Sequence, residues 1–527
     1  MKIPRILSRP PFTWLLKWGS IRCVCAIICF LTACAPKHNH EVNDIRESRL
    51  RMFEHTFNKV DRIYLKKIKL HKLAMAGLKS LSQIEPKFFA AKKNGDIEIS
   101  VSGVEAYRSK LPQSAKEWAH YFVNGLEKIS ALSHRIAKTS DEVIFEVIFS
   151  GLIGQLDKNS HYASAQIAAA NRVNRQGYGG IGVTLETHSE GARIVKVVEN
   201  LPAALSNLRT GDVIKIVSGT NISGFPINKI QELIRGPINV PVSVQIRRGL
   251  RSPPKRYLLE RARITTDTVS VSYKQGISFF RISSFNQETS KQLERLIKQT
   301  KQVRVKNLKG IVLDLRGNPG GLFNQAIKIA DLFLNDGDIV STRGRHVRSV
   351  KTFKAKHGDI LKGLPMAVLV DGATASSAEI IASALQDNGR AVIIGSSSFG
   401  KGTVQTIITL PNNGELTLTW ALLVAPSNYT LERFGVIPSI CTSYKNVVHR
   451  NFDEIASYSS SLYQQNLHLR RTLSKPLSIN KLKVKKMCEW RSKEKNSHDD
   501  LIAVKVLRSK SRYSEVIALM KFKSEHQ

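Results

Sequence analysis

Apolar and polar residues divide the chain into three regions with different periodicity. Residues 61–170 carry a mainly helical pattern, and the segment DEVIFEVIFSGLIGQLD has apolar residues on more than one face, which indicates a buried helix. From about residue 177 the pattern changes to short β runs such as ARIVKVVE, GDVIKIVSG and VPVSVQIRR, separated by Gly, Pro and Asn turns. Between residues 277 and 440, strands alternate with helices. That alternation favours an α/β core.

One junction in the α/β region places two serines between a strand and a helix. The strand is PMAVLVD, the helix is SSAEIIASALQDNG, and Ser376 and Ser377 begin the helix. A serine at this position can cap the helix or act as a nucleophile. The nearest histidines along the chain, His357 and His449, lie in no recognisable partner motif. A nucleophilic serine here would therefore need a different base.

The segment SSSFGKGTVQ, residues 396–405, contains a candidate base in Lys401. Burial disfavours the charged form of lysine, so a desolvated lysine can accept a proton from a serine. The glycines on both sides of Lys401 allow a tight backbone turn. Gln405, four residues later, could orient the amine by hydrogen bonding. Taken alone, a lysine in a glycine-rich turn is usually a solvated loop residue.

The two segments together resemble the C-terminal processing peptidases, also called tail-specific proteases. TASSAEIIASALQDNGRAVIIG followed by FGKGTVQ is similar to that family's T-A-S-A-S-E, A-L-Q-D-x-x-R-A and F-G-K-G-x-x-Q motifs. The resemblance implies that Ser376 is the nucleophile, that Lys401 is the general base and that Gln405 supports the lysine. This chain has Ser377 and then Ala378 where the family has alanine and then serine, so Ser377 is a competing candidate.

A glycine-rich turn supplies a candidate oxyanion hole. LDLRGNPGGLF, residues 313–323, is similar to the family's D-L-R-x-N-P-G-G segment. Free backbone N–H groups where a strand leads into a helix suit a developing oxyanion. The resemblance implies that the N–H of Gly320 or Gly321 acts together with that of Ser377. The alternative is that Pro-Gly-Gly only makes a sharp turn.

The β-rich stretch resembles a PDZ domain. YGGIGV, residues 178–183, is similar to the carboxylate-binding loop of such domains. The resemblance implies that the N–H groups of Gly180, Ile181 and Gly182 bind the terminal carboxylate of a peptide that adds to the sheet as a strand. The expected partners are protein or peptide substrates with free apolar C-termini. A glycine-rich turn in another kind of small β domain is the alternative.

The N-terminal segment has the pattern of an export signal. Basic residues precede a short apolar run, CVCAIICFLTA, which has about half of the ~20 residues that a membrane-spanning helix needs. LTAC, residues 31–34, resembles a bacterial lipoprotein signal that is cut before Cys34, which would then carry lipid. We therefore expect a protein of the bacterial cell envelope, on the periplasmic side, lipid-anchored to the membrane, with an adaptor lipoprotein as a further candidate partner. An ordinary secretory signal is the alternative.

Charge and cysteine content add limits on partners and cofactors. The formal net charge of +38 would suit nucleic acid or an anionic membrane. The charge is spread along the whole chain without a zinc-finger, basic-zipper or aromatic RNA-binding signature, so we expect no nucleic-acid partner. Beyond the signal and Cys34, only Cys441 and Cys488 remain; they could form a disulfide or stay free thiols. They are too few for a zinc site, and we expect no metal and no cofactor.

Together with the resemblance, these patterns predict the α/β fold class: a crotonase-like α/β peptidase core with an inserted β-rich PDZ domain and N-terminal helices. The expected domains are a lipoprotein signal peptide at 1–33, a tether and helical region at 34–170, a PDZ domain at 171–265, a Ser-Lys peptidase core at 266–440 and a basic C-terminal extension at 441–527. The expected function is a serine endopeptidase that recognises substrate C-termini through its PDZ domain. The alternatives are a catalytically degenerate PDZ-containing binding lipoprotein and a basic envelope protein that binds polyanions.

Overall fold

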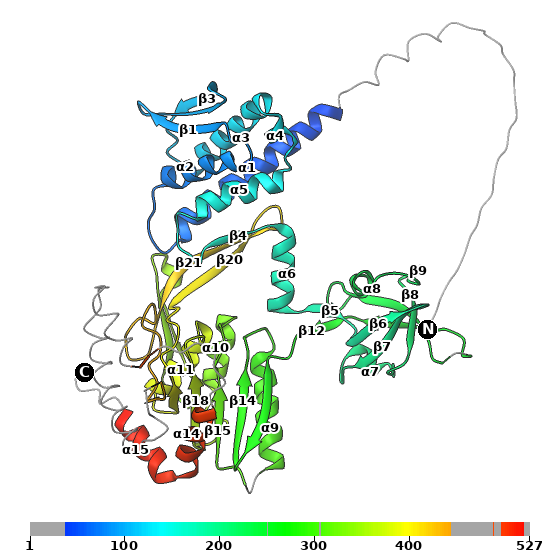
Figure 1. Ribbon diagram of the computed structural model, residues 1–527, viewed down its shortest axis with the longest axis vertical. Helices are drawn as coiled ribbons and strands as arrows, with labels where there is room; N and C mark the ends of the chain where they lie inside the picture. The colour runs from blue at the N-terminus through cyan, green and yellow to red at the C-terminus, as the bar shows by residue number, and fades with distance from the viewer. Residues whose placement is uncertain (1–36, 250, 305–306, 444–487, 490–496, 521–527) are drawn as a thin grey trace, which may run out of the picture. The chain divides into compact units, whose positions relative to one another are not determined.

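The structure is a computed structural model that describes residues 37–249, 251–304, 307–443, 488–489 and 497–520 (Figure 1). It divides into two compact units, residues 1–49 and 50–527. In the first unit, the described residues belong to helix α1 (Lys37–Ile63). The expected signal peptide and Cys34 lie outside the described residues. No helix in the described ranges is both long enough and apolar enough to cross a membrane.

The N-terminal part of the second unit combines helices with a small sheet. Its helices are α2 (Leu70–Ser80), η1 (Leu81–Gln83), α3 (Ala115–Leu132), α4 (His134–Lys138) and α5 (Asp141–Ile153). The buried helix expected from the sequence is confirmed, because α5 buries both Phe145 and Phe149. The mainly helical pattern missed an antiparallel sheet of β1 (Phe88–Lys93), β2 (Asp96–Val101) and β3 (Val104–Lys110). Its first hairpin turns at Asn94 and Gly95, which both have positive φ, as a tight two-residue turn requires.

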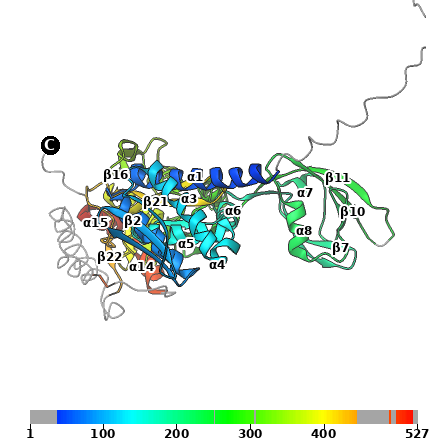
Figure 2. The ribbon, with the colours of Figure 1, turned by 90° about the horizontal axis from the view of Figure 1, so that it is seen from above.

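The β-rich region forms a domain of its own, reached through helix α6 (Ala165–Gln176). Its main sheet has the order β11-β10-β8-β7-β6, with β9 beside β8. Helix α8 contacts strands β6 and β8. Figure 2 shows this helix beside the strands of the domain. Strands β5 and β12, the first and the last strand of the domain, pair with each other and form a separate two-stranded stem. The bounds are β5 (Tyr178–Gly180), β6 (Val183–His188), β7 (Gly191–Val197), α7 (Pro202–Leu205), β8 (Val213–Val217), β9 (Thr220–Asn221), α8 (Ile227–Ile234), β10 (Pro241–Arg247), β11 (Lys255–Glu260) and β12 (Ala262–Ile264).

The α/β core is built on a six-stranded sheet with the order β13-β14-β15-β18-β19-β22. Strand β13 is antiparallel to β14, and the strands from β14 to β22 are parallel. Helix α10 packs between α9 and α11. The bounds are β13 (Val269–Lys274), β14 (Ile277–Ile282), α9 (Thr289–Val303), β15 (Gly310–Asp314), α10 (Phe323–Asp331), β18 (Met366–Val370), α11 (Ser377–Asp387), β19 (Val392–Gly395) and β22 (Ile440–Cys441).

A second sheet has the order β17-β16-β21-β20, and β4 pairs with β21. The β20–β21 hairpin reaches from the lysine segment to the N-terminal helices, where Leu410, Leu416 and Leu418 are buried in a shared apolar cluster. The bounds are β4 (His161–Ala163), β16 (Asp338–Arg343), η2 (Val347–Ser349), β17 (Lys351–Lys354), β20 (Thr403–Thr409) and β21 (Glu415–Val424).

Two helices from the end of the chain complete the core. Helix α14 (Ser497–Arg508) contacts strands β15, β18 and β19, and α15 (Lys510–Met520) contacts β19. Their buried side chains, including Val504 and Leu507, belong to the apolar cluster of the core sheet. The described part of the expected C-terminal extension is thus built into the α/β core. The predicted fold class, an α/β core with an inserted β-rich domain and N-terminal helices, is confirmed.

Candidate active site

The three motifs singled out in the sequence follow three neighbouring parallel strands. The glycine-rich turn comes after β15, Ser376 comes after β18, and the lysine loop, residues 396–402, comes after β19. The carboxyl ends of parallel strands lie at one edge of a sheet, where ligand and active sites of α/β folds form. The fold therefore brings segments that are far apart in the sequence to one edge.

Ser376 has a backbone conformation that is unusual for a residue with a side chain. It precedes α11 with φ 57° and ψ −116°, and it is half-buried. Holding such a conformation costs about 1–3 kcal/mol, and residues of this kind cluster at functional sites. Neighbouring hydrogen bonds fix it: the Ser376 N–H donates to Glu379 at 2.7 Å, and the Ala375 N–H donates to the Asn318 carbonyl at 2.9 Å.

The adjacent Ser377 is placed differently. Its side chain is buried, with 1% of its surface exposed, and its hydroxyl donates to the Gly321 carbonyl at 2.9 Å. The Ser377 hydroxyl thus has a structural partner, which favours Ser376 as the reactive serine. The Ser377 N–H, in the first turn of α11, has no hydrogen-bond acceptor among the described residues.

The glycine-rich turn lies directly against Ser376. Gly320 has φ 104°, and a Cβ at Gly320 would lie 2.9 Å from the Cβ of Ser376, so no other residue fits there without a shift. The Gly320 N–H donates to the Asn318 side chain at 2.8 Å. Within the described chain, the Gly321 N–H has no acceptor. Of the two glycines expected to bind an oxyanion, Gly321 therefore has the uncommitted N–H.

Glu379 joins the serine turn to the lysine loop, a role that the sequence analysis did not assign. Its side chain is fully buried, and one carboxylate oxygen accepts the N–H of Ser376 at 2.7 Å and the N–H of Lys401 at 3.0 Å. The other oxygen accepts the Gly400 N–H at 2.7 Å and the Ser398 hydroxyl. Burial raises the pKa of Glu379, and these hydrogen bonds oppose the rise. The Ser-x-x-Glu spacing of a capping box was the available sequence signal.

Lys401 is half-buried, and the glycines on both sides of it pack closely against the backbone of residues 431–433. A Cβ at Gly402 would lie 1.7 Å from the Glu432 nitrogen. Burial lowers the pKa of Lys401, and the charge of Lys158 adds to this effect, whereas Glu379, Glu432 and Asp157 oppose it. Compared with a solvated lysine, Lys401 is thus shifted toward the neutral amine that a general base requires. Among the described residues, no hydrogen bond joins the Lys401 amine to the Ser376 hydroxyl.

Gln405 lies on β20 and is held by two threonines. Its amide nitrogen donates to the hydroxyls of Thr403 at 2.9 Å and Thr419 at 3.2 Å. Thr403 also accepts from Asn159, at 3.2 Å, and Thr419 donates to Asp157 at 2.9 Å. No hydrogen bond links Gln405 to Lys401 in the part of the chain that the structure describes.

In the β-rich domain, the expected carboxylate loop leads into an edge strand. Gly180 ends β5, where it pairs with Ala262, and Ile181 and Gly182 connect it to β6. The carbonyls of Ile181 and Gly182 accept hydrogen bonds at 2.8 and 2.9 Å, but their N–H groups have no acceptor within the described ranges. Strand β6 pairs with β7 on one side only. The geometry therefore suits a peptide that adds beside β6 with its terminus at the loop.

Comparisons with known proteins agree with this arrangement. The profile of Peptidase family S41 matches residues 276–442, and that of the PDZ domain matches residues 171–247. The chain is 39% identical over 302 residues to the carboxy-terminal-processing protease of Bartonella bacilliformis, covering 57% of this chain and 70% of that protein. It is 29% identical over 358 residues to the carboxy-terminal processing protease CtpA of Bacillus subtilis, covering 66% and 75%.

Among solved structures, the photosystem II D1 C-terminal processing protease aligns with 21% identity and a TM-score of 0.38, covering 78% of this chain and 97% of that one.

Proposed function

Since this chain belongs to the carboxy-terminal-processing proteases of peptidase family S41, we propose that Ser376 and Lys401 are the pair with which this serine peptidase cleaves peptide bonds. The observation that carries the assignment is the buried carboxylate of Glu379, which accepts the backbone N–H of both residues. The test is cleavage of unfolded β-casein by the wild type and by Ser376→Ala, with the products identified by mass spectrometry.

In the proposed mechanism, neutral Lys401 takes the proton of the Ser376 hydroxyl as its oxygen attacks the peptide carbonyl. The oxyanion receives hydrogen bonds from the N–H groups of Ser377 and Gly321. Protonated Lys401 then gives its proton to the leaving amine, and the acyl-enzyme forms. Lys401 next deprotonates a water molecule, which releases the acyl group. Because only the neutral amine is a base, kcat rises with pH through the pKa of Lys401.

Gln405 has a positioning role in this proposal. The Thr403 and Thr419 hydroxyls fix its amide on the strand that follows Lys401. Asn159 and Asp157 connect the same threonines to the segment before β4. Gln405 would thereby set the course of the chain as it leaves the lysine loop.

We propose that the PDZ domain recruits substrates by a free, apolar C-terminus. A peptide acid should be cleaved about fivefold faster than its amide at low substrate concentration, because hydrogen bonds to a charged acceptor are stronger than neutral ones by ~1 kcal/mol. The measurement is the ratio of kcat/KM for matched acid and amide peptides.

The β5–β12 stem supplies the control for tail recognition. Gly180 pairs with Ala262 across the stem, so an Asn-Gly turn in place of residues 181–261 removes the domain and keeps the pair. This variant should cleave acid and amide at equal rates. Equal rates in the intact protein would contradict tail recognition and leave the peptidase assignment untouched.

We also propose that the protein works in the bacterial cell envelope, anchored by lipid at Cys34. The motive is the LTAC segment at 31–34. Metabolic labelling with a fatty acid should mark the wild type, and Cys34→Ser should lose the label because it has no thiol to acylate. The Cys29→Ser variant, changed within the expected signal, is the matched control. Continued labelling of Cys34→Ser would refute the anchor.

A further inference from the structure

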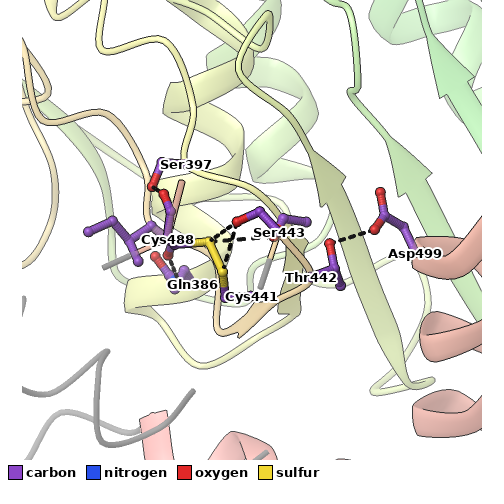
Figure 3. Close-up of a disulfide and its surroundings, with 9 residues drawn as sticks. Gln386, Ser397, Cys441, Thr442, Ser443, Cys488 and Asp499 are labelled. Atoms are coloured by element: carbon purple, nitrogen blue, oxygen red, sulfur yellow. Dashed lines mark hydrogen bonds between the residues drawn. A yellow bond between two sulfur atoms is a disulfide. The ribbon is translucent and has the colours of Figure 1, made fainter. Parts of the chain in front are cut away.

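A disulfide attaches a distant part of the chain to the end of the core sheet. Cys441, the last residue of β22, is bonded to Cys488, with 5.9 Å between their Cα atoms (Figure 3). The side chains of both are almost completely buried. Cys488 lies beyond residue 442, where the match to the peptidase family profile ends. The disulfide therefore fixes a residue from the C-terminal extension inside the core.

The backbone of Cys488 contacts the loop that carries the proposed base. The Ser397 hydroxyl donates to the Cys488 carbonyl at 2.7 Å, and the Ser397 side chain is 2% exposed (Figure 3). Ser397 lies between β19 and Lys401, next to Ser398, which donates to Glu379. The loop is therefore held from two directions, by α11 through Glu379 and by the C-terminal extension through Cys488.

Hydrogen bonds of Thr442 also hold the chain near the start of the lysine loop. The Thr442 N–H donates to the carbonyl of Gly395, the last residue of β19, at 2.8 Å, and its hydroxyl donates to Asp499 at 2.6 Å (Figure 3). Cys441 and Thr442 thus lie beside the end of β19, and Cys488 contacts the start of the lysine loop.

We propose that the Cys441–Cys488 disulfide positions the lysine loop for catalysis by holding the Cys488 carbonyl against Ser397. The inference deepens the proposed function, since it rests on Lys401 as the base. It makes Ser397 and the disulfide positioning elements rather than catalytic residues, because neither touches the reacting atoms. The two cysteines therefore serve the reaction as well as the stability of the fold.

The consequence for the pH profile follows from solvation. A loosened loop admits water to Lys401 and moves its pKa back toward the ordinary, higher value. The charged groups around it are Glu379 on α11, Glu432 after β21, and Asp157 and Lys158 before β4. All of them remain in variants of Ser397 or of the cysteines. The rising limb of kcat should therefore move to higher pH.

The test compares kcat between pH 6 and 10 for the wild type, Ser397→Ala and the double variant Cys441→Ser/Cys488→Ser. A hydrogen bond is worth about 1 kcal/mol, so Ser397→Ala should lower kcat at neutral pH about three- to tenfold and leave KM nearly unchanged. Ser383→Ala is the matched control, because its buried hydroxyl bonds a carbonyl of its own helix. It should keep the wild-type profile.

The outcomes separate the possible failures. A wild-type pH profile in Ser397→Ala, with at most a lower Tm, would overturn the inference and leave a disulfide that only stabilises the fold. If the double cysteine variant does not fold, Ser397→Ala decides alone, since it keeps the disulfide. Full activity of Lys401→Ala would instead contradict the proposed function, on which this inference rests.

Discussion

Replacing Ser376 by alanine is expected to abolish cleavage of unfolded β-casein while the protein still folds. The substitution removes the proposed nucleophilic oxygen. Alanine has a Cβ as serine does, so the strain of a backbone with φ 57° is unchanged and Tm should stay near that of the wild type. Lys401→Ala should have the same effect, because Lys401 is the proposed acceptor of the Ser376 proton. Removal of one member of a catalytic serine–base unit lowers kcat by roughly 10⁴–10⁶, and the double variant should be no worse than either single one.

Two further variants test the assignment of roles. Lys401→Arg should be inactive, because a guanidinium stays protonated at any assay pH. Ser377→Ala should stay active, because the Ser377 hydroxyl donates to the Gly321 carbonyl and has no proposed role in the reaction. The substitution also keeps the backbone N–H of residue 377. An active Ser376→Ala together with an inactive Ser377→Ala would reverse the assignment of the nucleophile. An active Lys401→Arg would remove lysine from the mechanism.

The second large effect is expected at Glu379. In Glu379→Gln, an NH2 group replaces one carboxylate oxygen, so two of the four donors lose an acceptor or face another donor. Depending on which oxygen is replaced, the affected pair is the N–H groups of Ser376 and Lys401 or the two other donors of the lysine loop. Losing two hydrogen bonds to a charged group at about 1.5–3 kcal/mol each predicts a fall in kcat of at least about a hundredfold. Steady-state kinetics on the same β-casein substrate, with Tm measured alongside, checks this.

Glu142 provides the control for a glutamate with several donors. It accepts from the Tyr162 hydroxyl at 2.9 Å, the Ala165 N–H at 3.3 Å and the Asn412 amide at 2.9 Å, in the N-terminal part of the fold. Glu142→Gln should lower Tm and leave kcat close to the wild-type value. If both variants lower Tm alike and neither changes kcat, Glu379 is a structural residue only.

The site motifs could be predicted because each is local. A strand, a short turn and a helix are encoded together in LDLRGNPGG and in PMAVLVDGATASS, and alternation of strands and helices makes the strands parallel. The resemblance supplied the roles, while the structure supplied the reason that the segments meet: β15, β18 and β19 are neighbours in the sheet. The order of strands depends on contacts between distant segments, which the sequence pattern does not encode.

Other features were missed or left open for the same reason. The β1–β3 sheet has a local sequence signal, the Asn94-Gly95 turn, but the helical pattern on both sides of it predicted helix for the whole region. From the sequence, Glu379 is an ordinary capping residue; in the structure, both of its carboxylate oxygens also accept hydrogen bonds from the lysine loop. The bond between Cys441 and Cys488 joins residues 47 apart, and spacing alone could not distinguish it from two free thiols.

The position of α14 and α15 in the core has a consequence for how the protein comes into being. A ribosome delivers Ser376, Lys401 and the glycine-rich turn well before it delivers the two helices that contact β15, β18 and β19. Asp499 and Asp500, which pair with Arg316 beside that turn at 3.3 and 2.8 Å, also arrive late. A growing chain thus passes through a stage in which the proposed catalytic residues have been synthesised but α14 and α15 do not yet cover the core sheet. The core sheet is covered only after α14 and α15 have been synthesised and have packed against it.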